Sequence, residues 1–189
     1  MASANPRLID RDHLLTALDR ATAVKVTIVS GSAGSGKTSL LRIWARRVGQ
    51  ARGIADVQVR RDRPDAQLFW LELLNAVRRV STTAGTTEPA VPTPAFNERA
   101  IVDRVLGELA EYPRLLTLVI DDLHELDSSA TLAELTRLLT SLPPNVNALL
   151  ATRRDVGLRL QRLRLAGELA ELRAADLRFT EPETRELLD

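Results

Sequence analysis

The sequence of 189 residues contains no cysteine. Disulfide bonds are therefore excluded, and no thiolate can bind a metal ion or act as a nucleophile. Histidine is scarce as well: His13 and His124 are the only two, and they are too few and too far apart to suggest a zinc site. Aromatic residues make up only 3% of the chain, so we do not expect a stacking platform for single-stranded nucleic acid.

The chain also lacks a charge excess and a long apolar run. The formal net charge is +1, and the arginines alternate with acidic residues, so no basic field points to a nucleic-acid partner. No apolar run approaches the length of a membrane span, and the N-terminus lacks the layout of a secretion signal. We therefore expect a cytoplasmic protein without a membrane partner.

One glycine-rich segment gives the strongest functional signal. Residues 31–38, Gly-Ser-Ala-Gly-Ser-Gly-Lys-Thr, match the phosphate-binding pattern G-x-x-x-x-G-K-[ST] at every fixed position. The β-branched run Val24–Val29 precedes them and an amphipathic segment follows, which predicts the strand, turn and helix N-terminus that bind phosphate. The chain has only two lysines, and Lys37 falls where the pattern requires one. A glycine-rich turn that binds nothing is the alternative.

This segment, which we call the phosphate loop, is expected to hold a nucleotide. Lys37 should reach the β- and γ-phosphates and take part in catalysis, and the Thr38 hydroxyl should bind Mg²⁺. We expect Lys37 to point into solvent while the loop is empty, so that its replacement by alanine leaves the fold intact. The expected nucleotide contacts are Gly31, Ser32, Ala33, Gly34, Ser35, Gly36, Lys37, Thr38 and Ser39.

A buried strand that ends in two acids is the second signal. Asp121 and Asp122 follow the unbroken apolar run Leu115–Ile120, and ligands of parallel sheets bind at the carboxyl ends of the strands. We expect Asp121 to complete the Mg²⁺ coordination and Asp122 to orient or deprotonate the attacking water, a role for which Glu125 is an alternative. The pair could otherwise be a solvated turn.

The next apolar strand, Val146–Ala151, ends in two arginines. Arg153 and Arg154 would arrive at the same edge of the sheet, where a guanidinium can detect a γ-phosphate through charge-assisted hydrogen bonds. We expect Arg153 rather than Arg154 to do so. Pairing of both arginines with surface acids is the alternative.

Strands and helices alternate along the chain, which predicts an α/β fold: a P-loop NTPase three-layer sandwich with a mostly parallel central sheet flanked by helices. We expect a single nucleotide-binding domain over residues 1–189. Residues 81–97 hold three prolines and little charge, which predicts a long loop or flexible insertion. The expected strands are 24–29, 54–59, 115–120, 146–151 and an extended segment over 168–179. The expected helices are a short one from about Asp12, one from the phosphate loop to about Gln50, and those over 65–80, 98–111, 131–142 and 180–188, with a short helix or turn over 159–165.

Several segments together resemble the nucleotide-binding core of the STAND class of signal-transduction ATPases. They are the phosphate loop, the turn Leu-Val-Ile-Asp-Asp-Leu-His-Glu at 118–125 and the strand end Ala-Thr-Arg-Arg-Asp at 151–155. Residues 158–188 resemble the end of that core in large ATP-binding LuxR-type bacterial regulators, the group of the maltose-regulon activator.

The resemblance implies an ATP-driven switch with ATP or ADP and Mg²⁺ as cofactors. In that family the resting protein holds ADP, and inducer with ATP promotes an open form that self-associates and activates transcription. Hydrolysis by such a switch should be slow. The positions that match the family's site are Lys37, Thr38, Asp121, Arg153 and, in the partly matching adenine-contacting segment 9–12, Arg11.

The chain departs from that family in several ways. Asp10 stands where the adenine-contacting motif usually has glycine. The second sensor, the inducer-binding repeats and the helix-turn-helix have no counterpart in the sequence. We therefore expect an N-terminal fragment of a larger regulator, with self-association only of the full-length protein in its ATP state and no DNA contact from the fragment.

Other nucleotide-binding functions stay open. The main alternative is an ordinary P-loop ATPase or small-molecule kinase, and an AAA-type remodelling ATPase is a further one, because a single sequence does not expose the arginine finger and ring contacts that it needs. A GTPase is disfavoured: its N-K-x-D motif would require an Asn-Lys pair, which the chain lacks.

Overall fold

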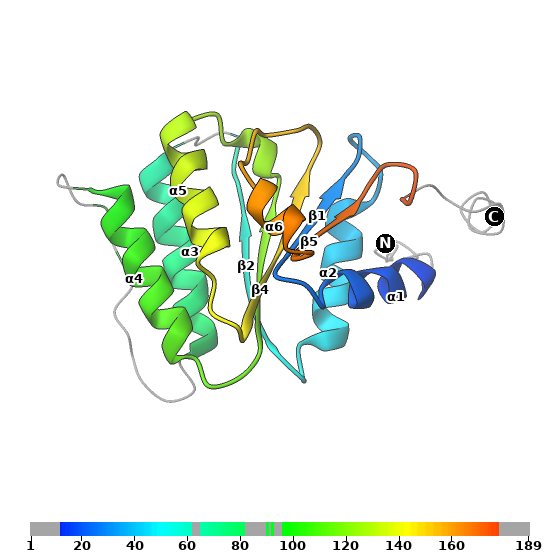
Figure 1. Ribbon diagram of the computed structural model, residues 1–189, viewed down its shortest axis with the longest axis horizontal. Coiled ribbons are helices and arrows are strands. Elements are labelled where there is room, and N and C mark those ends of the chain that lie inside the picture. The colour runs from blue at the N-terminus through cyan, green and yellow to red at the C-terminus, as the bar shows by residue number, and fades with distance from the viewer. Residues whose placement is uncertain (1–11, 62–64, 82–89, 91, 93–95, 178–189) are drawn as a thin grey trace, which may run out of the picture.

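The computed structural model describes residues 12–61, 65–81, 90, 92 and 96–177, which form a five-stranded sheet with helices on both sides (Figure 1). The strand order is β2-β3-β4-β1-β5, and every neighbouring pair is parallel. This confirms the predicted α/β class with a parallel sheet. The strands are β1 (Val26–Ser30), β2 (Gly53–Gln58), β3 (Leu116–Asp121), β4 (Val146–Thr152) and β5 (Leu169–Leu172).

Helices cover the two faces of the sheet as separate layers (Figure 1). One apolar cluster joins α3, α4 and α5 to the sheet, and a second joins α1 and α2 to the opposite face. The helices are α1 (Asp12–Ala21), α2 (Lys37–Val48), α3 (Ala66–Ser81), α4 (Glu98–Glu111), α5 (Ser129–Thr140) and α6 (Gln161–Leu165), with a 3₁₀ turn η1 (Leu123–Glu125). None of the described helices is long and apolar enough to cross a membrane.

The position of each strand in the sheet explains how clearly the sequence marks it. All six residues of β3 are buried, because helices cover both faces of this inner strand, and its sequence is a continuous apolar run up to the final acid. The edge strand β2 alternates: Ala55 and Val57 are buried, whereas Asp56 and Gln58 are exposed. Its hydrophobic signal in the sequence is correspondingly weaker.

Side-chain caps fix the first residues of two helices. Asn97 Oδ1 accepts a hydrogen bond from the Ala100 N–H at 3.1 Å, and α4 begins at Glu98 as predicted. Ser128 Oγ accepts one from the Thr131 N–H at 3.3 Å, so α5 begins at Ser129, two residues before the predicted start.

The predicted extended segment 168–179 is only partly correct. β5 ends at Leu172, because the chain then forms a turn: Asp176 Oδ2 accepts a hydrogen bond from the Arg173 N–H at 2.8 Å, and the Arg173 carbonyl accepts one from the Leu177 N–H at 3.2 Å. Most of the predicted insertion 81–97, the predicted helix 180–188 and Arg11 lie outside the described residues.

The strand order brings three segments that carry chemistry to one edge of the sheet. β4 lies between β1 and β3, with Ser30 paired to Thr152 and Ile120 to Leu150. The phosphate loop leaves β1, the acidic pair ends β3, and the two arginines follow β4. All three therefore lie at the carboxyl ends of neighbouring strands, where parallel sheets bind ligands.

Candidate nucleotide-binding site

The phosphate loop turns into α2 through two glycines in the left-handed conformation. Gly34 has a φ of 76° and Gly36 a φ of 79°, a backbone geometry that strains residues with a Cβ. Gly36 directly precedes the first helical residue, Lys37. The first amide N–H groups of α2 have no partner within the helix, and they stand at the positive end of its dipole. The loop thus has the features of an anion-binding site.

Lys37 is buried, which corrects our expectation that it points into solvent. Its exposed fraction is only 6%. The ammonium donates to the carbonyl oxygens of Gly31 (2.7 Å) and Ser32 (2.8 Å) and to Ser35 Oγ (3.2 Å). The side chain folds back along the loop because these three acceptors match its three N–H donors.

The charges around Lys37 favour an anionic ligand. Burial lowers the pKa of the Lys37 ammonium, and the positive charge of Arg153 lowers this pKa further. The carboxylates of Asp121 and Asp122 act in the opposite direction. An anion in the loop would offset both the desolvation of the ammonium and its repulsion by the guanidinium.

Thr38 and Asp121 are in direct contact although 83 residues separate them in the sequence. The Thr38 hydroxyl donates to Asp121 Oδ2 at 2.6 Å, and Asp121 Oδ1 accepts from the Asp122 N–H at 2.8 Å. Hydroxyl and carboxylate oxygens are ligands that Mg²⁺ prefers. Within the described part of the chain no group of three or more His, Asp or Glu side chains could hold a metal ion. A Mg²⁺ ion here would take its other ligands from phosphates and water, as is usual for this ion.

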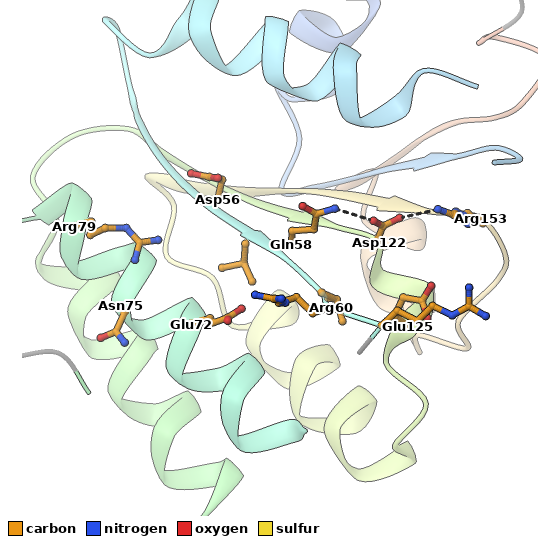
Figure 2. A pocket seen from close by; sticks show the side chains of 12 residues that line it. Asp56, Gln58, Arg60, Glu72, Asn75, Arg79, Asp122, Glu125 and Arg153 are labelled. Atoms are coloured by element: carbon orange, nitrogen blue, oxygen red, sulfur yellow. Dashed lines mark hydrogen bonds and ion pairs between the residues drawn. The ribbon is translucent and has the colours of Figure 1, made fainter. Parts of the chain in front are cut away.

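Asp122 combines an unusual backbone conformation with two side-chain neighbours, which Figure 2 shows. Its φ of 54° is the only positive φ of a non-glycine residue in the described ranges. Gln58 Nε2 donates to Asp122 Oδ2 at 3.1 Å, and Arg153 Nη2 lies 3.7 Å from Asp122 Oδ1. Gln58 is a residue that the sequence analysis missed, since no motif marks the last position of β2.

The second arginine after β4 points to a different partner. Arg154 Nη2 donates to the carbonyl oxygen of His124 in η1 at 3.1 Å. The His124 side chain is itself nearly buried beside the acidic turn, with Nε2 3.3 Å from Glu125 Oε1. This arrangement leaves Arg153, which is nearly half exposed, as the guanidinium beside Asp122.

A pocket of about 720 Å³ adjoins this cluster, and its lining carries charges of both signs. Figure 2 shows Asp56 and Gln58 on β2, Glu72 and Arg79 on α3, and Asp122 and Arg153 at one end of the pocket. The pocket therefore begins where the candidate nucleotide site ends.

Two curated bacterial proteins match almost the whole chain. The chain is 27% identical over 186 residues to the serine/threonine-protein kinase PknK of Mycobacterium tuberculosis, an alignment that covers 96% of this chain and 17% of that protein. It is 25% identical over 181 residues to the HTH-type transcriptional regulator MalT of Cronobacter sakazakii, with 95% and 20% covered. The chain thus spans a fifth or less of the length of these relatives.

Solved structures share the fold. Cdc6p of Pyrobaculum aerophilum superimposes with a TM-score of 0.66 at 14% identity, covering the whole of this chain and 51% of that one. The ORC1 protein of Aeropyrum pernix, solved in complex with DNA, gives a TM-score of 0.64 at 20% identity, covering 96% and 48%.

A family match spans most of the chain. Residues 7–151 match the family described as AAA ATPase domain. The matched segment contains the phosphate loop and the acidic pair at the end of β3, the two elements that meet in the Thr38–Asp121 contact. The chain therefore belongs to the AAA ATPase domain family.

Proposed function

We propose that this domain is a regulatory switch that binds ATP or ADP with Mg²⁺ and hydrolyses ATP slowly. The observation that carries the proposal is the 2.6 Å contact between Thr38 Oγ1 and Asp121 Oδ2 at the start of α2. In the proposed complex the amide N–H groups of residues 32–39 and the Lys37 ammonium hold the phosphates, whereas the Gly31 N–H donates to the Thr152 carbonyl. Thr38 and Asp121 hold the metal ion, which neutralises phosphate charge.

The remaining polar groups suit the γ-phosphate end of such a ligand. Asp122 and Glu125 line the pocket next to the loop and are the candidates for orienting the attacking water. Arg153 lies close enough to Lys37 to lower its pKa, so the two cations would both gain from the same phosphate group.

A regulatory role, rather than rapid turnover, is supported by the similarity to MalT, a transcriptional regulator. We propose that the chain is the nucleotide-binding part of a STAND-type, LuxR-like regulator that self-associates in its ATP state. In such a switch the nucleotide acts through its different affinities for two conformations. The sequence would then represent only one part of the signalling protein, as its share of the relatives' length suggests.

One observation favours a second function, that of a small-molecule kinase. The pocket beside Asp122 has a volume of about 720 Å³, within the range of small-molecule sites, and contains carboxylates and guanidinium groups that could orient a polar phosphoryl acceptor. A kinase would turn over at about 1–100 s⁻¹ once its acceptor is supplied.

Thermal unfolding with ATP, ADP and GTP, each with and without Mg²⁺, tests the proposal. A nucleotide at a hundred times its Kd should stabilise the fold by about 2.7 kcal/mol. This corresponds to a rise of about 5–10 °C in the unfolding midpoint of a chain of this size. We expect this rise with ATP and ADP but not GTP, and ATP turnover well below about 1 s⁻¹. Equal stabilisation by GTP, or none by either adenine nucleotide, would contradict the proposal.

Gln58→Ala should slow ATP hydrolysis about three- to tenfold without changing the Kd for ATP. The Gln58 amide positions the Asp122 carboxylate through the 3.1 Å hydrogen bond. It lies at the end of the edge strand β2, outside the phosphate loop, so the Kd should not depend on it. Single-turnover hydrolysis and calorimetry separate the two quantities. Asp56→Ala, on the same exposed face of β2, is the matched control and should leave both unchanged. A loss of ATP affinity in the Gln58 variant would speak against a positioning role.

A further inference from the structure

The last residue that the structure describes, Leu177, packs against the first glycine of the phosphate loop. A Cβ added at Gly31 would lie 3.0 Å from Leu177 Cδ1 and 2.9 Å from Ser35 Oγ. Both distances are shorter than the 3.5–4.0 Å or so of a comfortable carbon contact. Leu177 is 2% exposed and belongs to the apolar cluster of α1 and α2, with Leu18, Leu40 and Val29. The contact is therefore part of a packed core.

Gly31 also accepts a hydrogen bond from Lys37, the lysine that is proposed to bind the phosphates. Its carbonyl oxygen accepts the Lys37 ammonium at 2.7 Å, and its N–H donates to the Thr152 carbonyl at 3.2 Å. Leu177 thus lies on one side of a glycine that also contacts Ser35, the Lys37 side chain and the end of β4. A shift of Leu177 would change the room available to Gly31, and with it the position of the lysine.

A hydrogen-bonded turn after β5 places Leu177 at this contact. Residues 173–177 form a turn in which the Asp176 and Leu177 N–H groups donate to the Arg173 carbonyl. The Asp176 carboxylate in turn accepts a hydrogen bond from the Arg173 N–H. The turn carries the chain from the sheet edge to the phosphate loop. It lies beyond residues 7–151, which match the family.

We propose that Leu177 is a positioning residue of the nucleotide site, which couples the turn of residues 173–177 to the phosphate loop. The proposal rests on the proposed nucleotide-binding function. When Leu177 is seated, Gly31 is fixed and the Lys37 ammonium is held at a defined place for the phosphates. When Leu177 leaves this position, the loop loosens and nucleotide affinity falls; conversely, bound nucleotide favours the turn with Leu177 in place, as linkage requires.

A double-mutant cycle on the 189-residue chain tests this coupling, with ATP binding measured by calorimetry in Mg²⁺. Leu177→Ala alone should raise the Kd for ATP about fivefold, because the loop loses its support. Gly31→Ala alone should raise it at least tenfold or so, because the new methyl group collides with Leu177 and Ser35. When Leu177→Ala is added to the Gly31→Ala variant, it should lower the Kd for ATP instead of raising it, because it removes one of the two collisions.

Leu18→Ala is the matched control: it removes the same atoms from the same cluster and is not among the nearest neighbours of Gly31. It should lower the unfolding midpoint in the absence of nucleotide but leave the Kd for ATP unchanged. If Leu177→Ala prevents folding, Leu177→Val takes its place in the cycle, because it also removes the contacting end of the side chain.

The outcomes separate this inference from the function on which it rests. Absence of ATP binding by the unmutated chain would overturn both. If the unmutated chain binds ATP but Leu177→Ala changes the Kd by the same factor in both backgrounds, or by no more than Leu18→Ala does, only the coupling through Leu177 is overturned. A change of sign between the two backgrounds, with Leu18→Ala neutral, supports it.

Discussion

Lys37→Ala should weaken ATP binding at least about a hundredfold. Charge-assisted hydrogen bonds contribute about 1.5–3 kcal/mol each, and the ammonium is expected to give at least two of them to the β- and γ-phosphates. Each 1.4 kcal/mol corresponds to about a factor of ten in Kd. Arg153 would approach the phosphate from the side of Asp122, so it does not take over the hydrogen bonds that Lys37 gives inside the loop. Calorimetric titration with ATP and Mg²⁺ measures the change.

The buried position of Lys37 changes what this variant does to the fold. Alanine removes three hydrogen bonds, to the Gly31 and Ser32 carbonyls and to Ser35 Oγ, which destabilises the loop. It also removes a buried ammonium, whose desolvation lowers its pKa and destabilises the folded state. Its loss therefore stabilises the fold. The two effects oppose each other, so we expect the free energy of unfolding to change by only about 1 kcal/mol.

The second lysine of the chain supplies the control for this experiment. Lys25 forms an ion pair with Glu168 at 3.2 Å, just before β1 and at the opposite end of that strand from the phosphate loop. Lys25→Ala removes the same charge and should leave ATP affinity within about twofold. Unchanged ATP affinity in Lys37→Ala would show that the phosphates bind elsewhere.

Sequence patterns could predict the layers of the fold and the motifs of the site. The inner strands were predicted well because burial on both faces leaves a continuous apolar run, as in β3. The glycine pattern predicted a turn between a strand and a helix, and Gly34 and Gly36 form it in the left-handed conformation. The end of β5 was not predicted correctly, because a turn closed by local backbone hydrogen bonds and the Asp176 carboxylate has no periodic signature.

The contacts that complete the site depend on tertiary packing and could not be predicted in this way. Lys37 was expected in solvent because a motif fixes the identity of a side chain but not the acceptors that surround it. Gln58 reaches Asp122 only because β2 and β3 pair in one register, with Gln58 beside Asp121. Leu177 reaches Gly31 only because a turn reverses the chain after β5.

Asp121→Asn should abolish the effect of Mg²⁺ on ATP binding and reduce hydrolysis at least about a hundredfold. The carboxylate uses both oxygens as acceptors: Oδ1 for the Asp122 N–H and Oδ2 for the Thr38 hydroxyl. An asparagine can offer only one oxygen. Because the Asp122 N–H is a fixed donor, the amide oxygen should turn toward it, and the NH₂ group should face Thr38.

The substitution therefore removes the carboxylate as a candidate metal ligand and weakens the hydroxyl as the other. Thr38 Oγ1 becomes the acceptor of an N–H bond, which occupies one of its two lone pairs. ATP affinity without Mg²⁺ should stay equal or rise, because one negative charge next to the phosphates is gone. Titrations with and without Mg²⁺ distinguish this outcome from general damage to the loop, which would weaken ATP binding under both conditions.

Asp127→Asn removes the same charge from an exposed position six residues further along and should leave the Mg²⁺ effect intact. An intact Mg²⁺ effect in Asp121→Asn as well would mean that another acid holds the metal, and the Thr38–Asp121 contact would then be a structural hydrogen bond only.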